Sequence, residues 1–145
     1  MAFRGQYEHS LDSKDRLTVP SAFREALSGE IVLAKGPDPC LWLMPKEDFE
    51  AMSAQYIAPH SPFGANARRL RRFFNANASQ GELDSAGRVR IAGKLIEAAG
   101  LEGSCAVVGA GEYVEIWSAD AWEKETELLE SEFAEIAETM AGTVE

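Results

Sequence analysis

The pattern of apolar and polar positions in this chain occurs twice, at an interval of about 72 residues. The shared features are an apolar and polar alternation around an acidic turn, a Glu-Ala pair and a later apolar strand. They occupy residues 11–19, 25–26, 41–44 and 49–50 in the first copy and 83–91, 97–98, 114–117 and 122–123 in the second. Because self-similarity at a fixed interval marks a duplicated unit, the pattern predicts two copies of about 45 residues each.

Each copy is predicted to form two strands, a short helix and two further strands, followed by another helix. The alternation on either side of the acidic turn predicts a hairpin. Next comes a short helix, which is expected to end at a glycine, Gly29 or Gly100. Two apolar runs joined by a glycine-rich or proline-rich segment predict the last strands. The helix and these strands are expected at 21–27, 31–34 and 41–44 in the first copy, and at 92–99, 105–108 and 113–117 in the second.

Between the copies, helical spacing of apolar residues predicts two helices at 46–57 and 63–75. A single copy is too small to be stable alone, whereas two related copies can cover each other's sheets. The expected fold is therefore α+β, an internal pseudo-dimer with peripheral helices. The expected divisions are a first domain at 1–52, a helical connector at 53–76, a second domain at 77–122 and an acidic amphipathic helix at 123–145.

The last predicted helix starts at Ser118 or Asp120 and ends at Ala141. Its apolar residues repeat at helical spacing and form one stripe. This stripe can pack against its own domain or against a neighbouring subunit, and the sequence leaves both possibilities open. The stripe consists of Trp122, Leu129, Phe133, Ile136 and Met140.

The net charge of −10 is concentrated at the C-terminal end. Residues 112–145 contain eleven acidic residues and one basic residue, Lys124, whereas residues 1–111 are balanced. Four arginines between 68 and 72 lie on or beside the polar face of a connecting helix, where a simple solvated surface is the ordinary interpretation. A basic surface is thus available despite the acidic total, and nucleic acid remains a possible partner.

Catalytic and metal-binding patterns are absent from the sequence. Cys40, Cys105, His9 and His60 are isolated, and no phosphate loop or nucleophile motif occurs. We therefore expect no enzyme activity, no cofactor and no metal, with both cysteines as buried thiols. No long apolar run or secretory signal is present, so we expect a cytoplasmic protein without a membrane partner.

The element common to both copies is Asp-x-x-x-Arg at the acidic turn, from Asp12 to Arg16 and from Asp84 to Arg88. An Asp at the end of a strand can accept hydrogen bonds from backbone N–H groups of the turn. Two interpretations remain open. The Asp–Arg pair can simply hold the turn together, or the outward arginine can contact DNA bases or phosphates.

These motifs, together with the start segment Phe3-Arg4-Gly5, resemble the MraZ family over nearly the whole chain. The resemblance implies two tandem AbrB/SpoVT-type swapped-hairpin units, similar to double-psi barrels, and ring-shaped homo-oligomers. It also implies a nucleoid-associated regulator that binds promoter DNA and represses the bacterial division and cell-wall gene cluster, including its own gene. The DNA-binding residues implied by the resemblance are Asp12, Lys14, Arg16, Asp84, Arg88 and Arg4.

Two positions depart from the family pattern. Asp15 stands where a glycine is usual, and we expect it to adopt the left-handed turn while adding an unfavourable charge near phosphate. Ala86 replaces a lysine-like residue in the second copy, which predicts that the first copy carries more of the DNA contact. An antitoxin-like or structural protein-interaction module of the same fold is the alternative function.

Overall fold

The structure, a computed structural model, describes residues 2–142 of the chain. Its elements follow the predicted repeat, since each copy contains two strands, a helix, two strands and a helix. The first copy contains β1 (Gln6–Ser10), β2 (Arg16–Thr18), α1 (Ser21–Arg24), β3 (Ile31–Lys35), β4 (Cys40–Pro45) and α2 (Lys46–Met52). The π-helical turn η1 (Ser53–Ile57) and α3 (Ala65–Ala76) connect it to the second copy. The second copy contains β5 (Ala78–Gly81), β6 (Arg88–Arg90), α4 (Gly93–Ala99), β7 (Ser104–Gly109), β8 (Val114–Ser118) and α5 (Ala119–Ala141).

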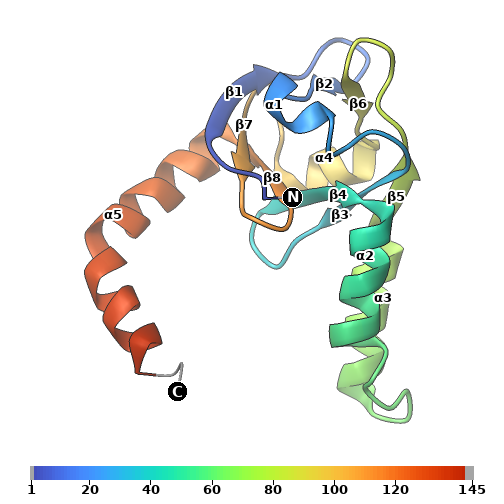
Figure 1. The fold of residues 1–145 in the computed structure, drawn as a ribbon, viewed down its shortest axis with the longest axis vertical. Helices are drawn as coiled ribbons and strands as arrows, with labels where there is room; N and C mark the ends of the chain where they lie inside the picture. The colour runs from blue at the N-terminus through green and yellow to red at the C-terminus, as the bar shows by residue number, and fades with distance from the viewer. Residues whose placement is uncertain (1, 143–145) are drawn as a thin grey trace.

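The strands of the two copies are exchanged within one antiparallel six-stranded sheet (Figure 1). Its order is β1-β7-β8-β4-β3-β5, so the first strand of each copy pairs with the third strand of the other. Strands β4 and β8 join the copies at the centre of the sheet. This mixed α+β fold of two tandem swapped units is the architecture that the resemblance implied.

The prediction of a hairpin at each acidic turn is wrong, because the strands on the two sides of the turn do not form a ladder with each other. Strand β1 does not continue into a ladder with β2, and the two sides of the first turn meet in an isolated bridge between Leu11 and Leu17 and in the hydrogen bonds of the turn itself. Instead, β2 pairs with β6 in a separate two-stranded ribbon. The reason is burial. Leu17 and Val89 lie opposite each other in this ribbon and both enter the core, while β1 is mostly exposed.

Both copies contribute to the main hydrophobic core. Buried residues of the β2–β6 ribbon, of the short helices and of the central strands form one cluster, which includes Leu17, Phe23, Leu43, Leu95 and Ile116. Burial of large apolar side chains stabilises each of them by about 1.5–3 kcal/mol, and here one cluster buries side chains of both copies. The copies therefore cover each other, as an internal pseudo-dimer should.

The helices follow their predicted positions with one shortening. Helix α1 ends at Arg24 rather than Leu27, because the chain continues in turns with hydrogen bonds from Leu27 to Phe23 and from Ser28 to Glu25. Helix α4 runs to its predicted left-handed cap at Gly100, where φ is 62°. Helix α5 starts at the hydroxyl of Ser118, which accepts from the N–H of Ala121.

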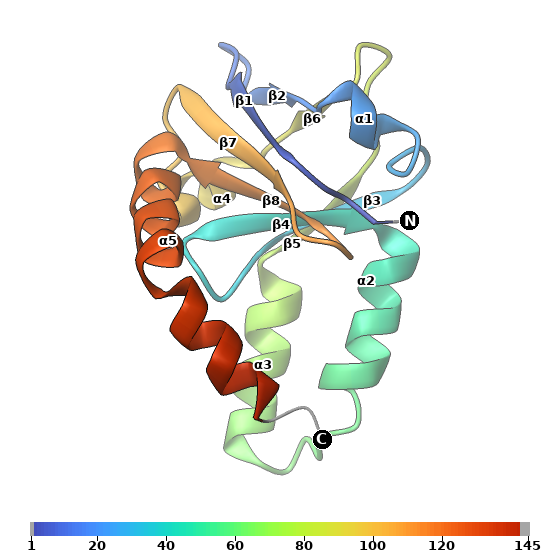
Figure 2. The same ribbon diagram turned by 60° about the vertical axis from the view of Figure 1, so that its left-hand side comes forward.

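Two helical projections leave the sheet. Helices α2 and α3 form a hairpin, held where Phe49 stacks on Phe74 at 4.4 Å between ring centroids. In Figure 1 this hairpin and α5 leave on opposite flanks, while the turns before β2 and β6 lie at the other end of the molecule. Figure 2 shows the same separation of the turns from the helical hairpin. No helix within residues 2–142 is long and apolar enough to cross a membrane.

Candidate nucleic-acid interface

The first acidic turn is held by the carboxylate of Asp12. Its Oδ1 accepts hydrogen bonds from the backbone N–H of Lys14 at 2.8 Å and of Arg16 at 3.0 Å. Its Oδ2 accepts from Nε of Arg16 at 2.8 Å. The N–H of Asp12 donates to the carbonyl of Arg16, and the N–H of Asp15 donates to the carbonyl of Asp12. One carboxylate thus fixes both the loop and the direction of the arginine side chain.

The second turn repeats this network with Asp84. Its Oδ1 accepts from the backbone N–H of Ala86 at 3.0 Å and of Arg88 at 2.9 Å, and its Oδ2 accepts from Nε of Arg88 at 2.8 Å. The backbone hydrogen bonds are also the same: the N–H of Asp84 donates to the carbonyl of Arg88, and the N–H of Gly87 donates to the carbonyl of Asp84. The structure therefore brings together five of the predicted site residues as two equivalent turns: Asp12, Lys14, Arg16, Asp84 and Arg88.

Both turn carboxylates are stabilised in their charged form. The backbone N–H of Arg16, with further contributions from Lys14 and the Arg16 guanidinium, lowers the pKa of Asp12 to about 2. The backbone N–H of Arg88 and its guanidinium likewise lower the pKa of Asp84. Each aspartate is therefore a permanent acceptor near neutral pH.

The arginines retain free donors after pairing with the aspartates. Only Nε of Arg16 and Nε of Arg88 bond to a carboxylate, and within residues 2–142 no group accepts from their terminal nitrogens. A guanidinium offers five N–H donors in a planar fork. Holding the turn and contacting a ligand are therefore compatible roles, because the aspartate uses one edge of the fork and orients the other.

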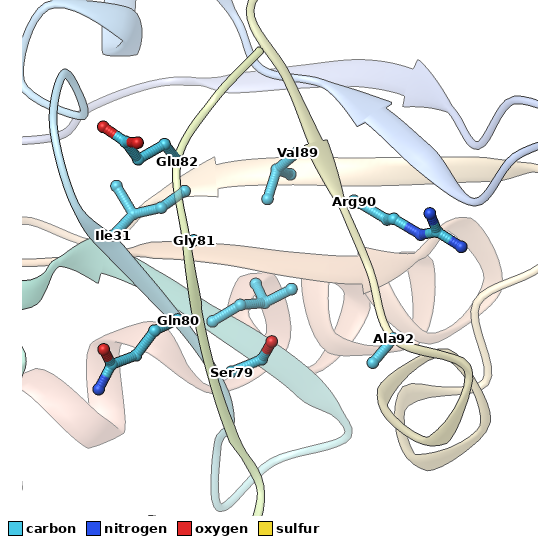
Figure 3. A pocket seen from close by; sticks show the side chains of 9 residues that line it. Ile31, Ser79, Gln80, Gly81, Glu82, Val89, Arg90 and Ala92 are labelled. Carbon is cyan, nitrogen blue, oxygen red and sulfur yellow. The ribbon is translucent and has the colours of Figure 1, made fainter.

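The ribbon of β2 and β6 presents a polar outer face. Successive side chains of a strand point to opposite faces, so burial of Leu17 and Val89 places their neighbours outward. Figure 3 shows the side chains of Val89 and Arg90 leaving β6 on opposite sides. The outward residues are Arg16 opposite Arg90, and Thr18 opposite Arg88.

Arg90 is a candidate that the sequence comparison missed. It is exposed, and the described part of the chain gives it no hydrogen bond or ion pair. Arg90 is not among the residues that the two copies share, because its counterpart in the first copy is Thr18. The alternation around Val89 was the available signal, since it predicts an outward residue at position 90.

The two turns are coupled across the ribbon. The carbonyl of Asp15 accepts from the N–H of Ile91, and the carbonyl of Gly87 accepts from the N–H of Val19, both at 2.9 Å. Each accepting residue is left-handed, with φ of 59° at Asp15 and 76° at Gly87. Asp15 adopts the left-handed turn, as expected. Each turn is therefore braced by the strand that follows the turn of the other copy.

Arg24 distinguishes the second turn from the first. Its Nε donates to the carbonyl of Val19 at 2.8 Å, and its guanidinium lies where a Cβ on Gly87 would be. The equivalent position in the second copy is Ile96. A side chain at position 87 is thus strained by φ and would displace the Arg24 guanidinium, whereas position 15 accommodates Asp15 at a similar φ. Arg24 also adds a cation beside the second turn, which offsets the loss of a lysine at Ala86.

Arg4 lies away from the turns. The start segment is held by hydrogen bonds between Phe3 and Gly111 and from Gly109 to Gly5. Strand β1 lies between Arg4 and Asp12, and eight residues of extended chain span roughly 25 Å. The structure therefore does not bring Arg4 to the ribbon, and its role in DNA binding stays a prediction.

The arginines of α3 divide into two pairs. Arg68 donates to the carbonyls of Pro62 and Phe63, and Arg71 donates to those of Ala58 and His60, so these two hold the loop before α3. The other two, Arg69 and Arg72, are exposed, and no partner for either occurs in residues 2–142.

Neither cysteine is available for chemistry in this structure. Cys40 and Cys105 are both buried and free. Burial raises the pKa of each thiol, and the nearby Glu115 carboxylate adds to the rise at Cys40. Among the described residues, no group of three or more His, Cys, Asp or Glu could hold a metal ion.

Two copies that exchange strands around a shared ribbon, with an arginine-bearing turn at each end of it, define the class of tandem swapped-hairpin β proteins. The family model described as "MraZ protein, putative antitoxin-like" matches residues 2–73 and again residues 74–144. The chain therefore belongs to the MraZ family, and the two matches correspond to its two copies.

Relatives of similar length carry the same family name. The protein from Heliobacterium modesticaldum named "Transcriptional regulator MraZ" is 39% identical over 139 residues, covering 95% of this chain and 96% of the relative. A protein of the same name from Thermomicrobium roseum is 40% identical over 142 residues, covering 98% and 99%.

Proposed function

We propose that this chain is a non-catalytic, sequence-specific DNA-binding transcriptional regulator that contacts duplex DNA with the β2–β6 ribbon and its two turns. The observation that carries the proposal is the pair of arginines, Arg16 and Arg88, each oriented by an aspartate on one exposed ribbon. The names of the relatives, which are transcriptional regulators, support the same function.

The ribbon has the dimensions and chemistry for a DNA groove. A two-stranded β ribbon fits the major groove, where an arginine fork binds O6 and N7 of guanine. The aspartate fixes Nε before binding, so less side-chain freedom is lost when the free edge of the guanidinium meets a base. Arg90 and Lys14, both at the first-turn end of the ribbon, add cations that can pair with phosphates.

The net charge of −10 does not prevent the ribbon from contacting DNA. The surplus acids lie in α5 and near it, whereas the ribbon and turns carry Lys14, Arg16, Arg88 and Arg90. Two of the nearby acids, Asp12 and Asp84, already accept several N–H groups within their turns. The local surface is therefore more favourable to phosphate than the net charge suggests.

The resemblance extends the proposal to the target and the assembly. We propose a ring-shaped homo-oligomer, in the cytoplasm and associated with the nucleoid, that represses the division and cell-wall gene cluster including its own gene. Several ribbons on one ring would meet repeated DNA sites together, so weak individual contacts would combine into tight binding.

Binding to naked DNA tests the function directly. Fluorescence anisotropy with a duplex from upstream of the chain's own gene should show binding that weakens steeply as salt is raised, because phosphate contacts release counterions. An unrelated duplex of equal length should bind more weakly. Equal affinity for both duplexes, or no binding at low salt, would reject sequence-specific regulation.

The alternative is an antitoxin-like protein-interaction module, which the description of the family model favours. Such a module would use the same fold to bind a protein. Naked promoter DNA separates the two functions, since a protein partner is absent from that experiment and only the DNA-binding function predicts a salt-dependent complex.

A further inference from the structure

Only the start of the apolar stripe of α5 packs on its own chain, where Trp122 lies against Trp117 with ring centroids 5.5 Å apart, and among the described residues the rest of the stripe has no place in the core. The helix is roughly 35 Å long, and none of its described side chains is buried. Near its start, Trp122 donates to the side chain of Gln6 at 2.8 Å. Further along, Leu129, Phe133 and Ile136 remain 40%, 68% and 42% exposed. Contiguous exposed apolar surface of this kind marks an interaction site.

Acidic residues border this stripe. Residues 119–141 contain eight acidic residues and one lysine. Glu125 and Glu132 lie four positions before and three positions after Leu129, so they share its side of the helix. The partner surface for α5 should therefore combine apolar and basic side chains.

The outward face of α3 has that combination. Leu70 and Phe73 are 40% and 41% exposed, while Phe74 faces the helical hairpin. Arg69 and Arg72 lie beside them, exposed and without a partner among the described residues. Helix α3 contains no acidic residue. Aromatic residues and arginines are enriched where proteins meet.

We propose that the acidic apolar face of α5 (Glu125, Leu129, Glu132, Phe133 and Ile136) docks on the basic apolar face of α3 (Arg69, Leu70, Arg72 and Phe73) of a second copy of this chain. Apolar contact supplies the attraction between the faces, and the opposite charges set the pairing and its orientation. This inference rests on the self-association in the proposed function, and it names the surfaces that form the contact.

A head-to-tail contact follows from where the two helices lie. Figure 1 shows α5 and the α2–α3 hairpin on opposite flanks of the sheet, so one chain presents a different surface on each side. Repeated contacts between two different surfaces generate rings when the rotation closes. Pairing of α5 with a second α5 would instead bring acidic side chains against acidic side chains. In the head-to-tail arrangement, the ribbon proposed to contact DNA stays free at the other end of the molecule.

Charge reversal tests the pairing through the mass of the full chain. One variant carries Glu125→Lys and Glu132→Lys, and the other carries Arg69→Glu and Arg72→Glu. Each variant alone places like charges against each other, so the concentration needed for half-assembly should rise by at least about tenfold in light scattering. An equimolar mixture of the two variants should assemble again, because the reversed α5 of one faces the reversed α3 of the other. One chain with all four changes should also assemble.

A matched control carries Glu127→Lys and Glu138→Lys, which make the same charge change on the opposite side of α5. It should assemble as the unmodified chain does. Circular dichroism melting checks that each variant folds, and Arg69→Ala with Arg72→Ala replaces the α3 reversal if that variant is unfolded.

The inference is overturned if changes in α3 leave the mass unchanged, if the α5 control disrupts assembly equally, or if the mixture does not recover. A monomeric unmodified chain would remove both the proposed ring and this contact. Salt-dependent DNA binding by the ribbon is measured separately and would stand or fall on its own.

Discussion

Arg16 and Arg90 are register partners in the antiparallel pair β2–β6, so arginines from two different copies share one face of the ribbon. Like charges directly opposite each other are unfavourable in a free protein. A bound anion or a base acceptor between them removes that repulsion. We therefore expect an anion bound at this face to stabilise the ribbon, although Asp12 already offsets part of the charge of Arg16.

Replacing Arg16 by Ala should weaken promoter binding much more than it weakens the fold. The turn keeps both backbone hydrogen bonds to Asp12, and a partly exposed ion pair contributes little stability. A good base contact is worth about 1–3 kcal/mol, and the loss multiplies when several subunits bind one operator. Anisotropy and thermal melting on the same sample measure both effects.

Arg88→Ala tests the second turn in parallel, and Lys124→Ala removes one exposed positive charge far from the ribbon as a control. The sequence predicts a smaller loss for Arg88→Ala than for Arg16→Ala, although Arg24 adds a cation near the second turn. A well-folded Arg16→Ala variant that binds as the control does would reject the ribbon as the DNA-binding surface.

Gly87→Ala should destabilise the protein, whereas Asp15→Gly should not. A non-glycine residue at φ of 76° costs about 1–2 kcal/mol, and the new Cβ also displaces Arg24 from the carbonyl of Val19. Urea denaturation gives both free energies of unfolding. Asp15→Gly should also tighten DNA binding by removing a carboxylate from the first turn.

A double-mutant cycle separates the two causes at Gly87. In the Arg24→Ala background the guanidinium is absent, so Gly87→Ala should retain only its backbone cost. Equal costs of Gly87→Ala in both backgrounds would show that Arg24 does not restrict this turn.

The sequence predicted the local structure of this protein better than its strand pairing. The repeat, the order of elements and the left-handed turn at Asp15 follow from short-range patterns. Alternation around Leu17 shows which face of a strand is buried, but it does not show which strand supplies the hydrogen bonds, and here β6 does so from 72 positions away. The candidate site was incomplete for a related reason, because Arg24 meets Gly87 only after the copies have exchanged strands.

Acid should remove the contribution of the Asp12 carboxylate to stability. Its pKa falls from 3.8 to about 2 on folding, so the folded state favours the charged form. That stabilisation is fully present above about pH 4 and is lost as the pH falls towards 2. The stability difference between the unmodified chain and Asp12→Asn should therefore be constant from pH 7 to 5 and shrink below pH 4, as measured by urea midpoints. A difference independent of pH would contradict the charged role of Asp12.

Arg90→Thr makes the two strands of the ribbon alike, since Thr18 is the equivalent residue in the first copy. The fold should not change, because Arg90 is exposed and has no partner within residues 2–142. If Arg90 pairs with phosphate, the variant should lose affinity for all duplexes alike, and the slope of log affinity against log salt should decrease by about one per ribbon engaged. If it reads a base, the loss should be confined to one operator position.

Thr18→Arg is the reciprocal change and should steepen the salt slope. Unchanged affinity and slope in Arg90→Thr, with an unchanged melting temperature, would exclude Arg90 from the interface and leave Arg16 and Arg88 as its arginines.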